Sequence, residues 1–503
     1  MQSYWIESVK NKNEYKELKE DIRTDVCIIG GGITGVSVAY KLVKENLNII
    51  LIEKDKMGYQ TTGNSTAKIT SQHGLFYKYL KDSKGEEFAK KYYEANENAI
   101  KDISNIIKEE KIDCDYEKQS AFIFAQSEEE DKKVKEEVEI VQSFGGRAKY
   151  IAKENIDKKV MNLNPISAIE FENQAQFNSY KYVSSLAEIC KNYGVSIYEN
   201  TKVVEVKNEE NYYTVHTENG CSIRTKYLVV ATKYPIINMP GFYFMKMYQS
   251  TSYAIAIETK EKLFEGMYIS SANPKISLRT AKEDDGYLLI VVGSDHKTGE
   301  DIDLTNSYKN LEDIAKKIYP VENIKYYWNT EDCITLDKIP YIGSYSKMWE
   351  NAYVATGFNK WGITTSNIAA EIISDNILGK ENEYEELYTS TRLEPIKNNT
   401  EMGNMLKETV NSLIIKKLKI PQEIEEKVKI GEGKIVEINA EKIGIYRNEK
   451  GILYRIIPKC KHLGCELIWN NLDKTWDCPC HGSRYDYKGK MIYGPTVKDL
   501  EKS

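Results

Sequence analysis

The sequence lacks three features that would each point to a particular class of protein. No stretch approaches the ~20 uninterrupted apolar residues that a membrane-spanning helix requires. Basic residues are not in excess, since 70 lysines and arginines stand against 76 acids, which gives no electrostatic reason to expect nucleic acid or an anionic membrane as a partner. The opening residues, MQSYWIESVKNKNEYK, carry charges where a secretory signal would be apolar. We therefore expect no transmembrane segment and a location in the cytoplasm.

The chain does have a globular composition and a clustered set of cysteines. Hydrophobic residues make up 41% and charged residues 29% of the 503 positions, and at ~150 residues per domain this length predicts about three structural units. Five of the nine cysteines are scattered, as buried small side chains usually are: Cys27, Cys114, Cys190, Cys221 and Cys333. The other four fall between positions 460 and 480. In a cytosolic chain such a cluster indicates a metal site before a disulfide framework.

A complete βαβ unit stands near the start of the chain. Residues 26–29 read as a short buried strand, and the glycine-rich turn GGGITG at 30–35 leads into a helix with small and apolar residues on one face. A second strand over 48–52 then ends in the acid Glu53. The free N–H groups and partial positive charge at the start of the helix would suit a pyrophosphate. This arrangement predicts a dinucleotide-binding site.

The spacing of the glycines and the acid has a physical purpose. Gly30 permits the tight turn, Gly32 lets the backbone approach the pyrophosphate, and Gly35 lets the helix pack closely on the strand. Glu53 can accept hydrogen bonds from both hydroxyls of an adenosine ribose and would repel a 2′-phosphate. The expected cofactor is therefore FAD or NAD and not NADP.

Several later segments match a known family. The first 395 or so residues resemble the FAD-dependent oxidoreductases of the D-amino-acid oxidase and glycine oxidase type, matching in order at GGGITG, Glu53, YLVVAT, LLIVVGSDH, TLDKIPYIG and TGFNKWGIT. The resemblance implies an α/β FAD-binding domain, Rossmann-like and of the glutathione-reductase type, with an α+β substrate domain. The FAD-binding segments would be about 20–75, 145–235 and 328–395, and the substrate segments about 76–144 and 236–327. The contacts to FAD that it implies are Gly30, Gly32, Gly35, Glu53, Lys54, Thr62, Val204, Ala231, Thr232, Asp337, Gly357, Phe358, Trp361, Gly362 and Ile363.

The same resemblance implies three catalytic residues around the flavin. Lys68 and His73, in the stretch STAKITSQHG, would lie beneath the ring, where a lysine could interact with reduced flavin or oxygen and a histidine could take a proton from an amine. Arg279 would present its planar fork to a substrate carboxylate. For each of the three the alternative is a structural role. Asp332 and Cys333 stand where the family commonly has Arg-Pro, and we expect Cys333 to be a core residue and not a covalent flavin anchor.

The clustered cysteines belong to a paired Cys-His pattern. Cys460-x-His462 is followed, after residues 463–477, by Cys478-x-x-His481. A Cys2His2 zinc site is one interpretation of this pattern. The flanking HLGC and PCHGS sequences instead resemble the Rieske 2Fe-2S module, in which two thiolates hold one iron and two imidazoles hold the other.

The Rieske resemblance implies roles for eight side chains. Cys460 and Cys478 would bind the first iron, His462 and His481 the second, Cys465 and Cys480 would form a disulfide, and Ser483 and Tyr485 would donate hydrogen bonds to the cluster. Short alternating strands predict a small all-β domain over 426–503, joined to the flavin region by a helical connector at 396–425. A Rieske oxygenase is not expected, because the three remaining histidines, at 73, 216 and 296, show no paired spacing for a second iron.

A hydride acceptor and a one-electron carrier on one chain suggest a division of labour. We expect an FAD-dependent dehydrogenase that oxidises an amine or amino-acid-like molecule and passes electrons singly through the cluster to an external acceptor. The whole chain resembles bacterial two-domain FAD/Rieske proteins. The alternative is an electron-transfer protein reduced by NADH or a partner protein, with no organic substrate. A closed flavin cavity bearing Lys68 and Arg279 favours the first hypothesis, and an open shallow face favours the second.

Overall fold

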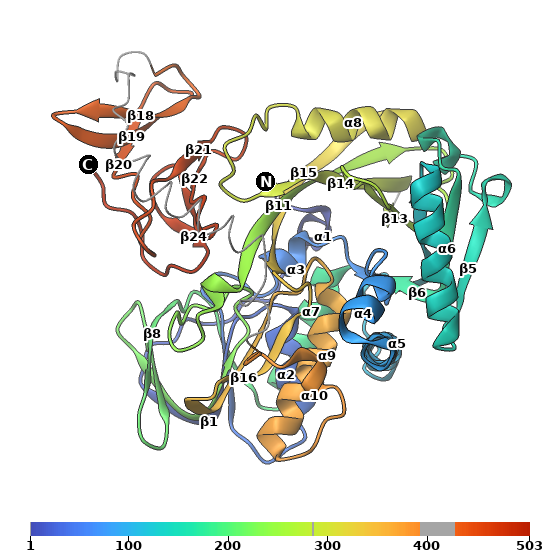
Figure 1. The fold of residues 1–503 in the computed structure, drawn as a ribbon. Helices are drawn as coiled ribbons and strands as arrows, with labels where there is room; N and C mark the ends of the chain where they lie inside the picture. Colours follow the sequence, from blue (N-terminus) through green and yellow to red (C-terminus); the bar gives the residue numbers. More distant parts are fainter. Residues whose placement is uncertain (1, 284–285, 393–427) are drawn as a thin grey trace.

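The computed structural model describes the chain except for residues 1, 284–285 and 393–427. Two large sheets with their helices make up the part before this last gap, and a smaller β domain lies against them at the C-terminal end (Figure 1). The predicted connector helix at 396–425 lies outside the described residues. Within the described ranges, no helix has the length and apolar character needed to cross a membrane.

The first large sheet carries the dinucleotide-binding unit. Its order is β16-β17-β10-β1-β2-β7, with β9 paired to β10 and β8 to β9. The strands are β1 (Ile22–Ile29), β2 (Ile49–Ile52), β7 (Ser196–Tyr198), β8 (Val203–Asn208), β9 (Tyr213–Thr217), β10 (Ser222–Val230), β16 (Tyr341–Ser346) and β17 (Trp349–Thr356). β1 pairs in parallel with both β2 and β10. The predicted strands at 26–29 and 48–52 are confirmed by β1 and β2. They could be predicted because strands buried on both faces are continuous apolar runs in the sequence.

Helices cover this sheet and close its core. Two of them, α2 (Ile33–Leu42) and α9 (Gly362–Leu378), pack on each other, and α2 also packs on α7 (Ser179–Asn192). α9 begins within the TGFNKWGIT segment. Three short helices complete this region: α1 (Tyr4–Glu7), α3 (Thr61–Asn64) and α10 (Glu385–Tyr388).

The second large sheet has the order β15-β11-β14-β13-β12-β4-β6-β3, with β5 paired to β6. Its strands are β3 (Lys68–Ile69), β4 (Glu117–Ala125), β5 (Ala148–Ala152), β6 (Ser167–Gln176), β11 (Met247–Thr259), β12 (Met267–Ser270), β13 (Ser277–Glu283), β14 (Gly286–Lys297) and β15 (Asn323–Thr335). β5 and β6 thus belong to this sheet, although the predicted boundaries put residues 145–235 with the FAD-binding segments. The reason is that β6 pairs with β4, which comes from the predicted substrate domain.

Two helices pack on this second sheet: α6 (Glu128–Ser143) on β4, β5 and β6, and α8 (Ser307–Ile318) on β11 and β14. α5 (Glu86–Glu109) packs on α9 and on α4 (Tyr77–Lys84). The short 3-10 turns are η1 (Lys153–Asn155), η2 (Val160–Leu163) and η3 (Tyr243–Met245). α6 exposes most of its charged side chains and buries the apolar stripe Val134, Val138 and Val141. The acidic and basic run over this helix is therefore a solvated face.

The C-terminal domain is all-β, as predicted. One sheet holds β18 (Gly433–Ile438), β19 (Glu441–Arg447) and β20 (Leu453–Ile456), and the other holds β21 (Ile468–Asn470), β22 (Thr475–Asp477), β23 (Arg484–Asp486) and β24 (Met491–Tyr493). Its small core is built around the fully buried Trp476 together with four cysteines. The loops before β21 and between β22 and β23 carry the paired Cys-His pattern.

Candidate functional site

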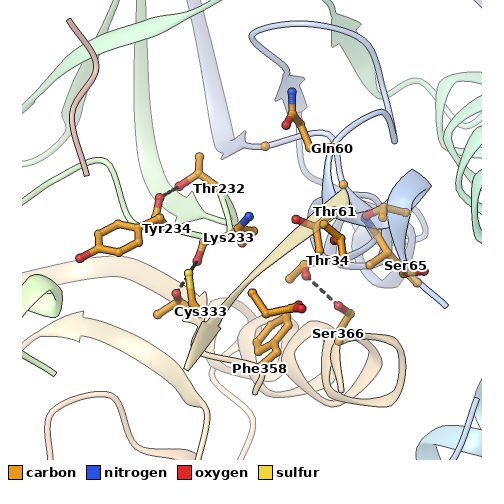
Figure 2. A pocket seen from close by; sticks show the side chains of 18 of the residues that line it. Thr34, Gln60, Thr61, Ser65, Thr232, Lys233, Tyr234, Cys333, Phe358 and Ser366 are labelled. Atoms are coloured by element: carbon orange, nitrogen blue, oxygen red, sulfur yellow. Dashed lines mark hydrogen bonds between the residues drawn. The ribbon is translucent and has the colours of Figure 1, made fainter. Parts of the chain in front are cut away.

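A cavity of about 320 Å³ opens where β1, β2 and β10 end. Parallel strands place their carboxyl ends at one edge of a sheet, and this edge is where nucleotide ligands bind in such folds. Two helices, α2 and α9, begin at the cavity, so their unpaired N–H groups and partial positive charge face it. Figure 2 shows Lys233, Tyr234 and Cys333 on one side, and Thr34 on the other with its hydroxyl 2.8 Å from that of Ser366.

The glycine turn has the geometry that the sequence predicts. Gly30 has φ +113°, and a Cβ atom there would lie 2.5 Å from the carbonyl oxygen of Ala231. A Cβ atom on Gly35 would lie 2.0 Å from the carbonyl oxygen of Gly30, so only glycine lets α2 pack this close to the turn. Gly32 lines the cavity between them.

Glu53 is buried at the end of β2 and lines the same cavity. Its carboxylate accepts hydrogen bonds from the backbone N–H groups of Gly31, at 2.8 Å, and Asp55, at 3.0 Å. Burial raises the pKa of Glu53, and these two donors oppose that change. The carboxylate is thus held in place beside the glycine turn, where a ribose would meet it.

Most of the residues assigned to FAD contact line the cavity. They are Gly30, Gly32, Glu53, Lys54, Thr62, Ala231, Thr232, Gly357, Phe358, Trp361, Gly362 and Ile363. Gly35 packs behind the turn. Val204 is exposed at its edge-side position in β8, and its neighbour Val203 lines the cavity instead, because successive strand residues face opposite sides. Asp337 does not line the cavity either, because it forms a bidentate ion pair with Arg392, with distances of 2.7 and 3.0 Å.

The cavity has features that fit FAD. A glycine-only turn stands before a helix start, and a buried acid follows the second strand. The Cys333 thiol also lies here, but burial raises its pKa to about 12 and its Sγ contacts the carbonyl of Lys233 at 3.6 Å, as a core residue would.

Of the three predicted catalytic residues, Lys68 and His73 line the cavity and Arg279 does not. Lys68 Nζ donates to Ser277 Oγ at 2.7 Å and to the carbonyl of Tyr268 at 3.0 Å. Burial, with a smaller effect from the charge of Arg279, lowers the pKa of Lys68 to about 7. This amine can therefore hold or release a proton near neutral pH.

His73 is fully engaged by its neighbours. Its Nδ1 accepts from the Tyr92 hydroxyl at 2.8 Å, and its Nε2–H donates to the carbonyl of Thr70 at 3.0 Å. Burial lowers the pKa of His73 to about 3. The ring stacks on Trp361 with centroids 4.8 Å apart. This placement favours a role in positioning Trp361 over the predicted role as a base.

Arg279 is a structural residue in this arrangement. Its guanidinium donates to the backbone carbonyls of Thr66, Ala67 and Phe177 at 2.8 to 3.1 Å and lies over the ring of Trp5. The guanidinium therefore ties three chain segments together, and the predicted contact with a substrate carboxylate is not supported.

Sequence patterns did not identify a pair of charged residues that lines the cavity, Lys360 in the turn before α9 and Asp295 on the second sheet. Lys360 Nζ donates to Ser252 Oγ and lies 3.2 Å from Asp295 Oδ2. Asp332 and Lys275 line the same part of the cavity. The available signal was the presence of single charges inside otherwise apolar or glycine-rich segments, such as LLIVVGSDH and TGFNKWGIT.

The Cys-His pattern folds into one compact site. The backbone N–H of His462 lies 3.5 Å from Cys460 Sγ. Tyr485 Oη lies 3.5 Å from Cys460 Sγ. Such donors stabilise a thiolate ligand. Cys465 and Cys480 form the predicted disulfide, joining the two loops.

The two histidines face each other as iron ligands would. The ring centroids of His462 and His481 lie 5.0 Å apart, and neither Nδ1 atom has a hydrogen-bond partner among the described residues. Burial lowers the pKa of His462 to about 4 and that of His481 to about 3, so both rings are neutral, as metal ligands must be. The buried hydroxyl of Ser483 is likewise without a partner in the described structure. These orphaned atoms fit a 2Fe-2S cluster held by the four predicted ligands.

Two polar side chains of the flavin region hold the cluster loops. Gln249 on β11 donates through Nε2 to the carbonyls of Gly482, at 2.8 Å, and His481, at 3.1 Å. Gln249 pairs across the sheet with Cys333, which lines the flavin cavity. His462 Nε2 lies 3.1 Å from Asn238 Oδ1, so its N–H donates to that amide. The cluster site therefore sits directly on a strand pair that borders the flavin cavity.

The contact between the two regions is close at backbone level and includes a buried ion pair. A Cβ atom on Gly299 would lie 2.6 Å from the carbonyl of Cys478, and one on Gly482 would lie 2.7 Å from Cβ of Gln249. Arg484 in the C-terminal domain pairs with Glu331 on β15, and also with Asp473 and Asp477 at 2.6 and 2.9 Å in its own domain. Removing one member of such a buried network costs about 3–5 kcal/mol.

Comparison with known proteins agrees with both sites. The family model for FAD dependent oxidoreductases matches residues 25–376, and the Rieske [2Fe-2S] domain matches 421–503. The Rieske 2Fe-2S iron-sulfur protein YhfW of Bacillus subtilis is 36% identical over 500 residues, which is 99% of this chain and 97% of that protein.

Two solved structures share the fold of the flavin region. Glycine oxidase from Geobacillus kaustophilus superposes with a TM-score of 0.63 at 18% identity, covering 74% of this chain and 99% of the oxidase. L-proline dehydrogenase from P. horikoshii superposes with a TM-score of 0.61 at 22% identity, covering 75% of this chain and 99% of the dehydrogenase. Together with the family matches, these findings mean that the chain belongs to the DAO family of FAD-dependent oxidoreductases and carries a C-terminal Rieske domain, with FAD and a 2Fe-2S cluster as its cofactors.

Proposed function

We propose that the protein is a dehydrogenase that oxidises a small amine or amino acid in the flavin cavity and delivers the electrons one at a time to an external acceptor through the Rieske cluster. Bound FAD would accept the hydride, and the 2Fe-2S cluster would carry single electrons. The residues of the chain orient the substrate, hold protons and keep the two cofactor sites adjacent.

The observation that carries this proposal is the contact made by Gln249. Its strand neighbour Cys333 lines the flavin cavity, and its side-chain amide binds the backbone of the loop that contains His481. Only one residue and one hydrogen bond therefore separate the lining of the cavity from a cluster ligand. Such a short connection favours electron transfer within the chain.

The charges in the cavity support the substrate class. Lys360 and Lys275 are cations, and Asp295 and Asp332 are acids, on the side formed by the second sheet and the turn before α9. An amino acid carries a carboxylate and an amine, which match these two kinds of group. Lys68, with its pKa near 7, could take a proton as the amine is oxidised. The two enzymes whose structures share this fold are named for glycine and L-proline, which agrees with an amino acid as the substrate class.

The experiment is anaerobic stopped-flow of the full-length protein with amines, amino acids and NADH, recording flavin bleaching and the EPR signal of the reduced cluster. We expect an amine or amino acid to bleach the flavin and the cluster signal to follow. Bleaching by NADH alone would overturn the proposal and would make the chain an electron carrier without an organic substrate.

A variant tests the carrying observation in the same experiment. Gln249→Leu keeps the size of the side chain but removes its amide, so we expect cluster reduction to slow about tenfold or more while flavin bleaching keeps its rate. Gln142→Leu, on the exposed face of α6, is the matched control. Equal rates of cluster reduction in both variants would show that Gln249 does not connect the sites.

A further inference from the structure

The C-terminal domain forms part of the wall of the flavin cavity. Met491 and Tyr493 of β24 line the cavity, and so do Gly494 and Val497 from the segment that follows. The carbonyl of Ile492, between the two strand residues, accepts a hydrogen bond from Lys54 Nζ. The wall is thus attached to the flavin region one residue after Glu53.

Tyr493 is the polar member of this wall. Its ring lies under Lys233, with Nζ 4.0 Å from the ring centroid. Its hydroxyl is buried and has no hydrogen-bond partner in the part of the chain that the structure describes. A buried tyrosine hydroxyl normally has a partner, and leaving one unpaired is costly. A ligand in the cavity would supply the missing partner.

The position of Tyr493 is set by the contact between the two regions. It pairs across the sheet with Arg484, and Arg484 forms the buried ion pair with Glu331 of β15. The strand that carries Tyr493 is therefore anchored to the flavin region on both sides, by Lys54 and by Glu331. A hydroxyl held this firmly is preorganised for a ligand.

The neighbours of Tyr493 indicate which part of the ligand it meets. Glu53, Lys54 and Lys202 line the cavity with it, and an acid at the position of Glu53 is the group that meets an adenosine ribose. Lysines beside it suit the phosphates. Because Lys54 donates to the carbonyl next to Tyr493, we place Tyr493 on the Glu53 side of the cavity.

We propose that Tyr493 is an FAD-binding residue supplied by the Rieske domain, its hydroxyl bonding the nucleotide half of the cofactor. The FAD site is then completed only when the two domains are docked, so the affinity for flavin depends on the C-terminal domain. This inference uses the assignment of FAD to the cavity and does not depend on the identity of the substrate.

The test measures FAD release from the full-length holoenzyme without substrate. Protein is diluted, and the gain in flavin fluorescence on release gives Kd. Tyr493→Phe keeps the ring over Lys233 and removes only the hydroxyl, so we expect Kd to rise about three- to tenfold, as the loss of one hydrogen bond predicts. Tyr454→Phe, in β20 and outside the cavity lining, is the matched control with unchanged Kd.

Two further readouts keep the result decisive. The EPR signal of the cluster should be the same in both variants, which shows that the domain is intact. Tyr493→Ala also removes the contact with Lys233 and should weaken FAD more than Tyr493→Phe does. An unchanged Kd in Tyr493→Phe would overturn the proposal, whatever the stopped-flow experiment finds about the substrate.

Discussion

The two cofactor sites of this protein are built in opposite ways. The four cluster ligands lie within positions 460–481, on two loops joined by one disulfide. The flavin cavity is lined by segments from Ile29 to Val497, drawn from both large sheets and from the C-terminal domain. The cluster site is therefore a local property of the sequence, whereas the flavin site exists only once the whole fold has formed.

The largest effect expected from this difference is loss of the cluster alone. His481→Ala removes one of the four predicted iron ligands, so we expect the optical and EPR signals of the cluster to disappear. FAD should remain bound, because the flavin cavity takes no side chain from either cluster loop. Loss of both cofactors together would contradict the view of the cluster as a local site.

A smaller effect is expected when the flavin site is weakened at one of its many parts. Glu53→Ala removes a carboxylate that accepts two backbone hydrogen bonds and faces the ribose, and we expect FAD affinity to fall roughly ten- to a hundredfold. The cluster signal per protein should not change. Glu45→Ala, on an exposed position after α2, is the control. Flavin fluorescence and EPR on the same sample measure both quantities.

A third prediction concerns pH. Burial lowers the pKa of Lys68 from 10.5 to about 7 in the folded protein, so between these values the unfolded chain binds more protons. The free energy of unfolding therefore rises with pH across this window, by up to about 1.4 kcal/mol per pH unit for one group. Lys68→Met should lose this rise, so the unfolding midpoint of the wild type should increase relative to that of the variant from pH 7 to pH 10. A difference that stays constant would mean that Lys68 keeps its charge.

The sequence predicted the disulfide that the structure shows, and it predicted the cluster ligands from information that is local. Each ligand is set by spacing along two short loops, and the disulfide partners Cys465 and Cys480 lie within the same stretch. The nucleotide-binding turn was predictable for the same reason, since Gly30, Gly35 and Glu53 belong to one βαβ unit.

The rest of the flavin site could not be predicted because tertiary contacts decide it. Val204 was predicted to contact FAD, but its neighbour Val203 lines the cavity instead. β8 begins at Val203, and successive residues of a strand face opposite sides, so a shift of one residue exchanges the two roles. Asp337 forms an ion pair with Arg392, and Arg279 donates hydrogen bonds to backbone carbonyls of distant segments. Nothing in the pattern of charges tells which partner an arginine will find.

The residues that connect the two sites left no signal in the sequence. Gln249 lies in the polar run QSTS at the start of β11, and Asn238 lies in a loop, so neither belongs to a motif. Tyr493 sits beyond the cluster loops in a segment that the Rieske resemblance alone would assign to the small domain. Their roles follow only from the docked arrangement.

The two interface glycines have a consequence for how such proteins can be recombined. At Gly299 and at Gly482 the backbone of one region meets the other so closely that even a methyl group would collide. A Rieske domain grafted from another protein would keep its cluster, but its backbone would not fit against the flavin region at these two close contacts. The Rieske domain of this chain thus cannot be exchanged on its own. A functional chimera would need the Rieske domain together with the strands β11 and β15 on which that domain packs.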